Sequence, residues 1–147
     1  MSTETQAQQT YFEDVSVGQE IELKLVPSTQ QLVQWAAGSG DFYQIHYDVE
    51  FARSTGLPGL IVHGALKHAL LGRMLHEWVG YGGKIKTWGV SYRGMDVPGQ
   101  EMTCKGVVTA KRREDGENLV DLDIWTANPE GQKTTPGTAT VALPSRG

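Results

Sequence analysis

Several features that would decide a protein's class are missing from this chain of 147 residues. It has one cysteine, Cys104, so an intramolecular disulfide is impossible, and we expect a small buried hydrophobic residue there. No apolar run approaches the roughly 20 residues that cross a bilayer, and residues 1–10 lack the apolar stretch of a secretory signal. We therefore expect a cytoplasmic protein with no membrane segment.

An excess of basic residues is also lacking, because Lys and Arg number 13 against 17 Asp and Glu, for a formal net charge of −4. This balance gives no indication of a nucleic-acid partner, and an anionic ligand would have to meet local positive charge. The length suits one domain with one core, without a separate cofactor domain. We expect a mobile tail over residues 1–10 and one domain over residues 11–147.

The strongest helical pattern covers residues 64–79. Apolar residues recur there every four positions, and Lys67 is expected to lie off that stripe. A helix with one strongly apolar face must pack against another element. Two shorter helices are predicted before it, one capped by Thr29 and one over residues 48–55.

Alternation of apolar and polar residues predicts one early strand and a group of later strands, with turns rich in Gly, Asn and Asp between them. The predicted strands cover residues 19–26, 87–93, 102–109, 120–125 and 138–143. One early strand, one long helix and four later antiparallel strands indicate an α+β fold. A curved antiparallel sheet wrapped around one long central helix is the simplest arrangement.

The residues that suggest chemistry lie just after the first predicted helix. Asp41 and His46 place a carboxylate and an imidazole five residues apart in a connection, where side chains can point into a cleft. The two groups could share one water, with one taking its proton and the other delivering a proton to a neighbouring carbon. The same spacing also arises by chance, with Asp41 as a helix cap and His46 on the surface.

A second candidate lies at the start of the long helix, where His63 precedes Gly64. A glycine there lets a substrate approach the backbone, and the free N–H groups of a helix start can hold a developing negative charge. A thioester carbonyl that becomes an enolate carries such a charge. Gly64 could equally be a plain helix cap, and His63 could line a pocket, cap the helix or hold the turn.

Together these segments resemble the MaoC-like dehydratases, hotdog-fold proteins that include (R)-specific enoyl-CoA hydratases. The family motif has the form D-x-N-P-[IL]-H, followed by a segment ending in x-A and then by [IV]-x-H-G. The step of 18 residues from His46 to Gly64 matches the family spacing. The matching residues are Asp41, Ile45, His46, Phe51, Ala52, Ile61, His63 and Gly64. Likeness near residues 91–93, 98–99 and 135–144 extends the match over nearly the whole chain.

The resemblance implies a single hotdog domain that hydrates a 2-enoyl-CoA reversibly to a 3-hydroxyacyl-CoA. Asp41 and His46 would activate the water, and the Gly64 N–H would form the oxyanion hole. Coenzyme A would enter as part of the acyl-CoA substrate, with no metal and no other cofactor. The resemblance also implies a homodimer or higher homo-oligomer, or assembly with a second hotdog subunit.

Two positions between the expected catalytic residues depart from the family, because Tyr43 replaces its Asn and Gln44 its Pro. Tyr43 can still donate a hydrogen bond, but it is larger and differently placed. This change favours a substrate other than a short, straight enoyl chain. Two alternatives remain: an acyl-CoA thioesterase, which would not need His46, and a subunit of a heteromeric, steroid-type enoyl-CoA hydratase.

The remaining charged residues give weaker expectations. Arg93 could contact a coenzyme A phosphate or lie in solvent, and residues 111–113 are expected to form a solvated turn. His68 and His76 lie two turns apart on the long helix, which is not zinc-ligand spacing, so no metal site is expected.

Overall fold

The computed structural model describes residues 8–147 of the chain. Residues 1–7 of the expected tail lie outside that range. Gln9 and Thr10, the last two residues of the expected tail, donate side-chain hydrogen bonds to the carbonyls of Val79 and Trp78, respectively, at the end of the long helix. A short 3₁₀ helix, η1 (Phe12–Asp14), leads into the first strand.

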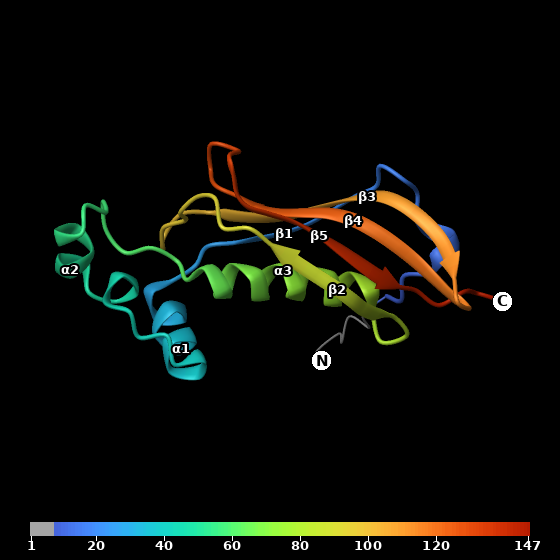
Figure 1. Ribbon diagram of the computed structural model, residues 1–147, viewed down its shortest axis with the longest axis horizontal. Coiled ribbons are helices and arrows are strands. Elements are labelled where there is room, and N and C mark those ends of the chain that lie inside the picture. Colours follow the sequence, from blue (N-terminus) through green and yellow to red (C-terminus); the bar gives the residue numbers. More distant parts are fainter. Residues whose placement is uncertain (1–7) are drawn as a thin grey trace, which may run out of the picture.

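Five antiparallel strands form one curved sheet in the order β1-β3-β4-β5-β2 (Figure 1). Their bounds are β1 (Glu20–Leu25), β2 (Lys84–Val90), β3 (Met102–Glu114), β4 (Glu117–Ala127) and β5 (Lys133–Ala142). The predicted fold class is confirmed, although three of the later strands are longer than the sequence pattern indicated. β3 and β4 continue to the tight turn at Asp115 and Gly116, which both have positive φ.

The sequence interpretation is wrong in two places along this sheet. Residues 111–113 lie within β3 and pair with β4 instead of forming a turn. Lys111 is held there by a hydrogen bond to the Val15 carbonyl and by the Phe12 ring under its ammonium. In addition, β2 ends at Val90, so Tyr92 and Arg93 belong to the loop that follows the strand.

The helices begin and end close to the predicted positions. α1 (Thr29–Ser39) is capped by Ser28, whose hydroxyl accepts from the Gln31 N–H, so the prediction of Thr29 as the cap is wrong by one residue. α1 ends at Gly40, whose φ of 80° suits glycine. The 3₁₀ helix η2 (Gln44–His46), α2 (Val49–Ser54) and α3 (Gly64–Val79) follow.

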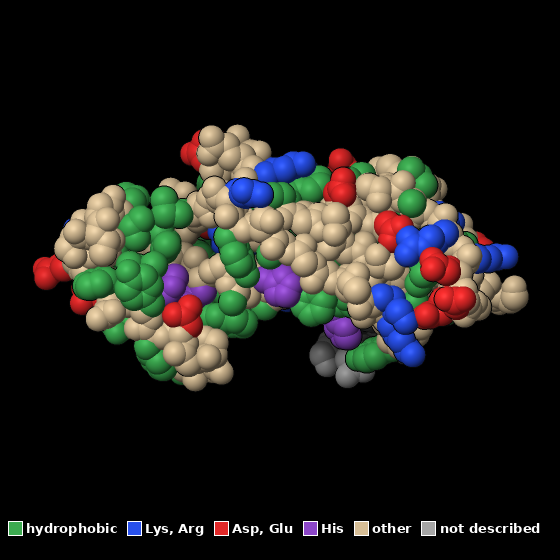
Figure 2. Space-filling view, viewed as in Figure 1, with side chains coloured by type: hydrophobic (Ala, Val, Ile, Leu, Met, Phe, Trp, Pro, Cys, Tyr) green, Lys and Arg blue, Asp and Glu red, His purple; other side chains and the backbone are tan. Residues whose placement is uncertain are grey.

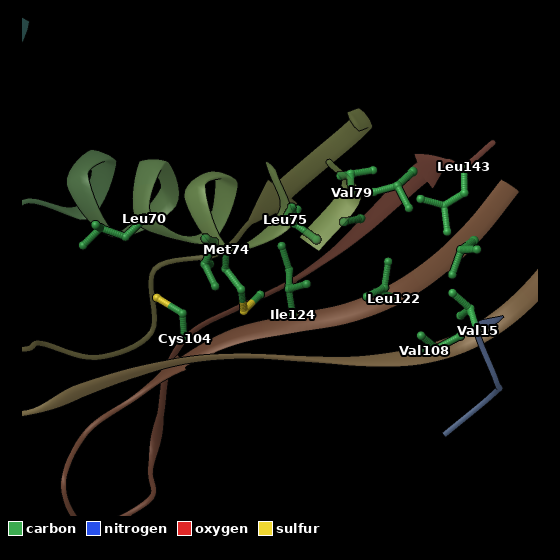
Figure 3. Close-up of a cluster of buried hydrophobic side chains, with 14 of the residues drawn as sticks. Val15, Leu70, Met74, Leu75, Val79, Cys104, Val108, Leu122, Ile124 and Leu143 are labelled. Carbon is green, nitrogen blue, oxygen red and sulfur yellow. The ribbon is translucent and has the colours of Figure 1, made fainter. Parts of the chain in front are cut away.

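The core lies between α3 and the concave face of the sheet. Figure 3 shows Met74 of α3 pointing towards Ile124 of β4, with Leu70 and Leu75 on the same helix and Leu122 further along the same strand. All five side chains are at most 5% exposed, so the contact between α3 and the sheet contributes strongly to the hydrophobic stabilisation of the fold. Cys104 is also buried here as predicted, and burial raises the pKa of its thiol to about 12.

Lys67 is the exception to the predicted helix pattern. It was expected off the apolar stripe, yet it is 2% exposed and is the largest of the fully buried side chains. The reason is that the first turns of α3 are covered by the loop after β2 as well as by the sheet. Asp96 of that loop, which is 5% exposed, meets the lysine ammonium.

The connection from α1 to α3, residues 40–63, extends beyond the end of the sheet at which α3 begins (Figure 1). It carries η2 and α2, and its first residues lie against His63, the residue before α3. None of the helices between residues 8 and 147 has the length and hydrophobicity that a bilayer crossing demands.

Candidate active site

Asp41, His46 and His63 converge at the amino-terminal end of α3. The Asp41 Oδ2 and His46 Nε2 atoms are 3.8 Å apart. Gly40 ends α1, and the Ser39 hydroxyl accepts from the Asp41 N–H, so Asp41 is the first residue to leave the helix. The Asp41 side chain is 46% exposed, whereas that of His46 is 8% exposed. The predicted pair is therefore brought together, with its carboxylate open to solvent.

The His46 ring is held in one tautomer. Its Nδ1 lies 2.8 Å from the Ile61 carbonyl oxygen, and because a carbonyl only accepts, Nδ1 carries the proton. The neutral ring then presents an unprotonated Nε2 beside Asp41. Two acceptors at 3.8 Å leave a gap that a water molecule can bridge, donating to one or both. This arrangement can polarise a water and accept its proton.

His63 supports that pair from behind. It is fully buried and stacks on His46, with ring centroids 3.8 Å apart. Its Nε2 donates to the Asp41 carbonyl, and its side chain makes no capping bond at the start of α3. Burial lowers the pKa of the His63 imidazole, and the neighbouring His46 lowers it further. Of the roles considered from the sequence, His63 therefore holds the turn.

The three groups offer ligand atoms within 4.8 Å of one another, which raises the question of a metal ion. The stacked His46 and His63 rings, only 21° from parallel, argue against a chelate. A metal binds an imidazole in the ring plane at about 2.0–2.1 Å, and two nearly parallel planes 3.8 Å apart do not share such a point. The geometry fits acid–base chemistry better than metal ligation.

Gly64 is the first residue of α3, so its N–H has no helical carbonyl to bond to. The Tyr92 ring lies against its α-carbon, because a Cβ at Gly64 would be 2.8 Å from a Tyr92 ring carbon. A side chain at this position would therefore displace the Tyr92 ring, which is 57% exposed. Tyr92 was missed as a site residue in the sequence, where it looked like one residue of a strand.

The two weaker candidates have different surroundings. Tyr43 is half exposed and packs edge-on against His46 and Phe51 at centroid distances of 6.4 and 5.9 Å. It therefore borders the site. Arg93 is exposed, and within residues 8–147 its guanidinium makes no ion pair.

Residues 7–126 match the model of the MaoC-like domain family. The chain belongs to this family. An (R)-specific enoyl-CoA hydratase of Aeromonas caviae is 29% identical over 133 residues, which cover 90% of this chain and 98% of that protein. The solved (R)-hydratase of A. caviae, described as involved in PHA biosynthesis, superposes with a TM-score of 0.83 at 30% identity, covering 90% of this chain and 99% of that one.

Two further similar chains belong to a complex and to a much longer protein. The ChsH1–ChsH2 complex of Mycobacterium tuberculosis contains a chain that is 25% identical, with a TM-score of 0.76 and coverage of 88% of this chain and 98% of that one. The fatty acid synthase beta subunit TOXC of Cochliobolus carbonum is 35% identical over 97 residues, or 64% of this chain. This chain spans only about 5% of that much longer protein.

Proposed function

We propose that the protein catalyses the reversible hydration of a 2-enoyl-CoA to a 3-hydroxyacyl-CoA. The observation that carries the proposal is the pairing of Asp41 Oδ2 and His46 Nε2, 3.8 Å apart, with His46 stacked on His63, the residue before Gly64 at the start of α3. Water addition to a conjugated thioester needs a base for the water, a donor for the developing oxyanion and an acid for the α-carbon. The family relationship to (R)-specific hydratases supports this choice.

The proposed steps use only these groups. His46 Nε2 removes a proton from a water held against Asp41, and the water oxygen adds to C3 of the enoyl group. The C2–C3 π electrons move towards the thioester, and the Gly64 N–H stabilises the resulting enolate oxygen. His46, now protonated, returns the proton to C2, which gives the 3-hydroxyacyl thioester. Coenzyme A takes part only as the substrate's carrier.

The surroundings of Asp41 support the proposal that a second chain completes the site. Phe42, Tyr43 and Tyr47 around it are 55%, 50% and 45% exposed, and Figure 2 shows hydrophobic side chains gathered with histidine at this end of the molecule. Water excluded from the site would strengthen the electrostatic contacts with the enolate. We propose a homodimer or higher homo-oligomer, with a second hotdog subunit as the alternative.

The test is turnover by the purified protein of crotonyl-CoA and of longer and ring-bearing 2-enoyl-CoAs, followed by loss of the conjugated absorbance. Asp41→Asn and His46→Gln should each lower kcat by about 100- to 10,000-fold. His76→Gln is the matched control, because His76 is exposed at the far end of α3 and should leave the rate unchanged.

Two results would overturn the assignment. The first is absence of turnover with all substrates, alone and after mixing with a candidate hotdog partner. The second is release of free thiol from saturated acyl-CoAs that persists in His46→Ala, which would indicate a thioesterase.

A further inference from the structure

A second pair of charged residues lies one helical turn from Gly64, and the proposed chemistry does not use it. The Lys67 ammonium and the Asp96 carboxylate are 3.0 Å apart, and both side chains are at most 4% exposed. Burying two charges costs much of what their attraction returns, so a buried ion pair is often no more stabilising than two apolar residues of similar volume. Stability alone is therefore a weak reason for this pair.

Further hydrogen bonds, from the loop after β2 and from β5, hold the pair in place. The Lys67 ammonium also donates to the Gly94 carbonyl at 3.0 Å. The Thr134 hydroxyl of β5 donates to the same Asp96 oxygen at 2.6 Å, and the Thr126 hydroxyl of β4 lies 2.8 Å from that of Thr134. Since Thr134 gives its one proton to Asp96, Thr126 must donate to Thr134. The network thus ties α3 to the loop after β2 and to two strands.

Three contacts connect this network to the candidate active site. The Asp96 carbonyl accepts from the Val62 N–H at 2.8 Å, just before His63 and Gly64. The Lys67 N–H bonds to the His63 carbonyl. Gly94 follows two residues after Tyr92, whose ring lies on Gly64. The walls of the proposed oxyanion hole are therefore attached to the same buried charges.

We infer that Lys67 and Asp96 are positioning residues, which hold the first turn of α3 and the Tyr92 loop together so that the Gly64 N–H faces the thioester oxygen. They touch neither water nor substrate in this account. A buried network with one satisfied arrangement resists small shifts better than an apolar contact, which can slide. Displacements of about 1 Å at a reacting centre can cost about 100-fold in rate.

The decisive variant is Lys67→Met/Asp96→Leu, which removes both charges and keeps the side-chain volumes similar. We expect a free energy of unfolding equal to or above that of the wild type. We also expect kcat to fall about 10- to 100-fold with KM nearly unchanged. Arg73→Gln/Glu77→Gln is the matched control, because it removes an exposed ion pair, 2.9 Å long, from the same helix.

The expected fall in kcat rests on the proposed hydratase activity. A second measurement, by NMR, does not depend on turnover. The two α-protons of Gly64 are diastereotopic, and the ring current of Tyr92, which lies against this residue, should enlarge their chemical-shift difference, so NMR reports whether the ring stays in place. We expect their chemical-shift difference to shrink in Lys67→Met/Asp96→Leu and to persist in the Arg73 and Glu77 control. A milder variant, Thr134→Val, leaves both charges but removes a bond to Asp96, and should reduce the difference less.

The outcomes separate the two proposals. A double variant that keeps both the Gly64 shift difference and the wild-type kcat overturns the positioning role. If the double variant does not fold, Thr134→Val provides the test. An unchanged Gly64 shift difference in Thr134→Val would also contradict the positioning role. A wild type without hydratase activity refutes the proposed function, while the NMR comparison still tests whether the network holds Tyr92 on Gly64.

Discussion

Two pairs of ionisable groups flank the start of α3, and they differ in nearly every respect. Asp41 and His46 lie 3.8 Å apart in a connection, with the carboxylate 46% exposed. Lys67 and Asp96 are in contact at 3.0 Å, buried, and bonded to surrounding groups. The loose, half-exposed pair leaves space for a water and a substrate. The tight, buried pair is held by neighbouring protein groups, which suits it to holding the structure in place.

The largest expected effect is a difference in stability between variants of the two pairs. Lys67→Met leaves Asp96 as a buried carboxylate without its cation, and should lower the free energy of unfolding by about 3–5 kcal/mol. Asp41→Asn should change it by less than about 1 kcal/mol, because the pair it disrupts is partly solvated. Urea unfolding of both variants under the same conditions measures the difference. Equal losses in the two variants would contradict the division between the pairs.

The sequence made the first pair visible and hid the second. Asp41 and His46 lie five residues apart within a motif, so local order along the chain was enough to predict that their side chains meet. Their catalytic role, and that of Gly64 at the family spacing, stays a prediction. The α+β fold followed from alternating strands and one strongly periodic helix.

The second pair could not be predicted because its members are 29 residues apart and belong to no local pattern. Lys67 has the polarity of a surface residue, and the loop after β2 together with the sheet makes it a buried one. Tyr92 was missed for a related reason, since it continued the alternation of β2 although the strand ends at Val90. Tertiary contacts decided both positions.

A smaller expected effect tests whether Tyr92 and Gly64 connect the two pairs. In Gly64→Ala the new methyl group meets Tyr92 ring carbons at 2.8 and 2.9 Å, so the ring must shift. Overpacking costs about 1–3 kcal/mol in a closed core, and the cost here should lie at or below the lower end because the Tyr92 ring is 57% exposed. Hydration should slow as the ring moves.

In a Tyr92→Ala background, the same Gly64→Ala change should be neutral or slightly stabilising, since alanine is the better helix former. A double-mutant cycle on the free energy of unfolding measures this coupling. Additive effects of the two substitutions would mean that the ring does not constrain Gly64.

The smallest expected effect concerns His63. This histidine is buried and donates a hydrogen bond to the Asp41 carbonyl. Burial and the neighbouring His46 hold the pKa of His63 below its ordinary value of 6.5, although the Asp41 carbonyl and carboxylate oppose the shift. Between the folded and the unfolded pKa of His63, the unfolded chain therefore binds a proton at this residue that the folded chain does not. The free energy of unfolding rises with pH over that range. The contribution is complete above pH 6.5 and is lost as the pH falls below that value. Unfolding free energies measured between about pH 8 and about pH 5.5 should fall more steeply for the wild type than for His63→Gln, and parallel slopes would show that His63 does not stay neutral in the folded protein.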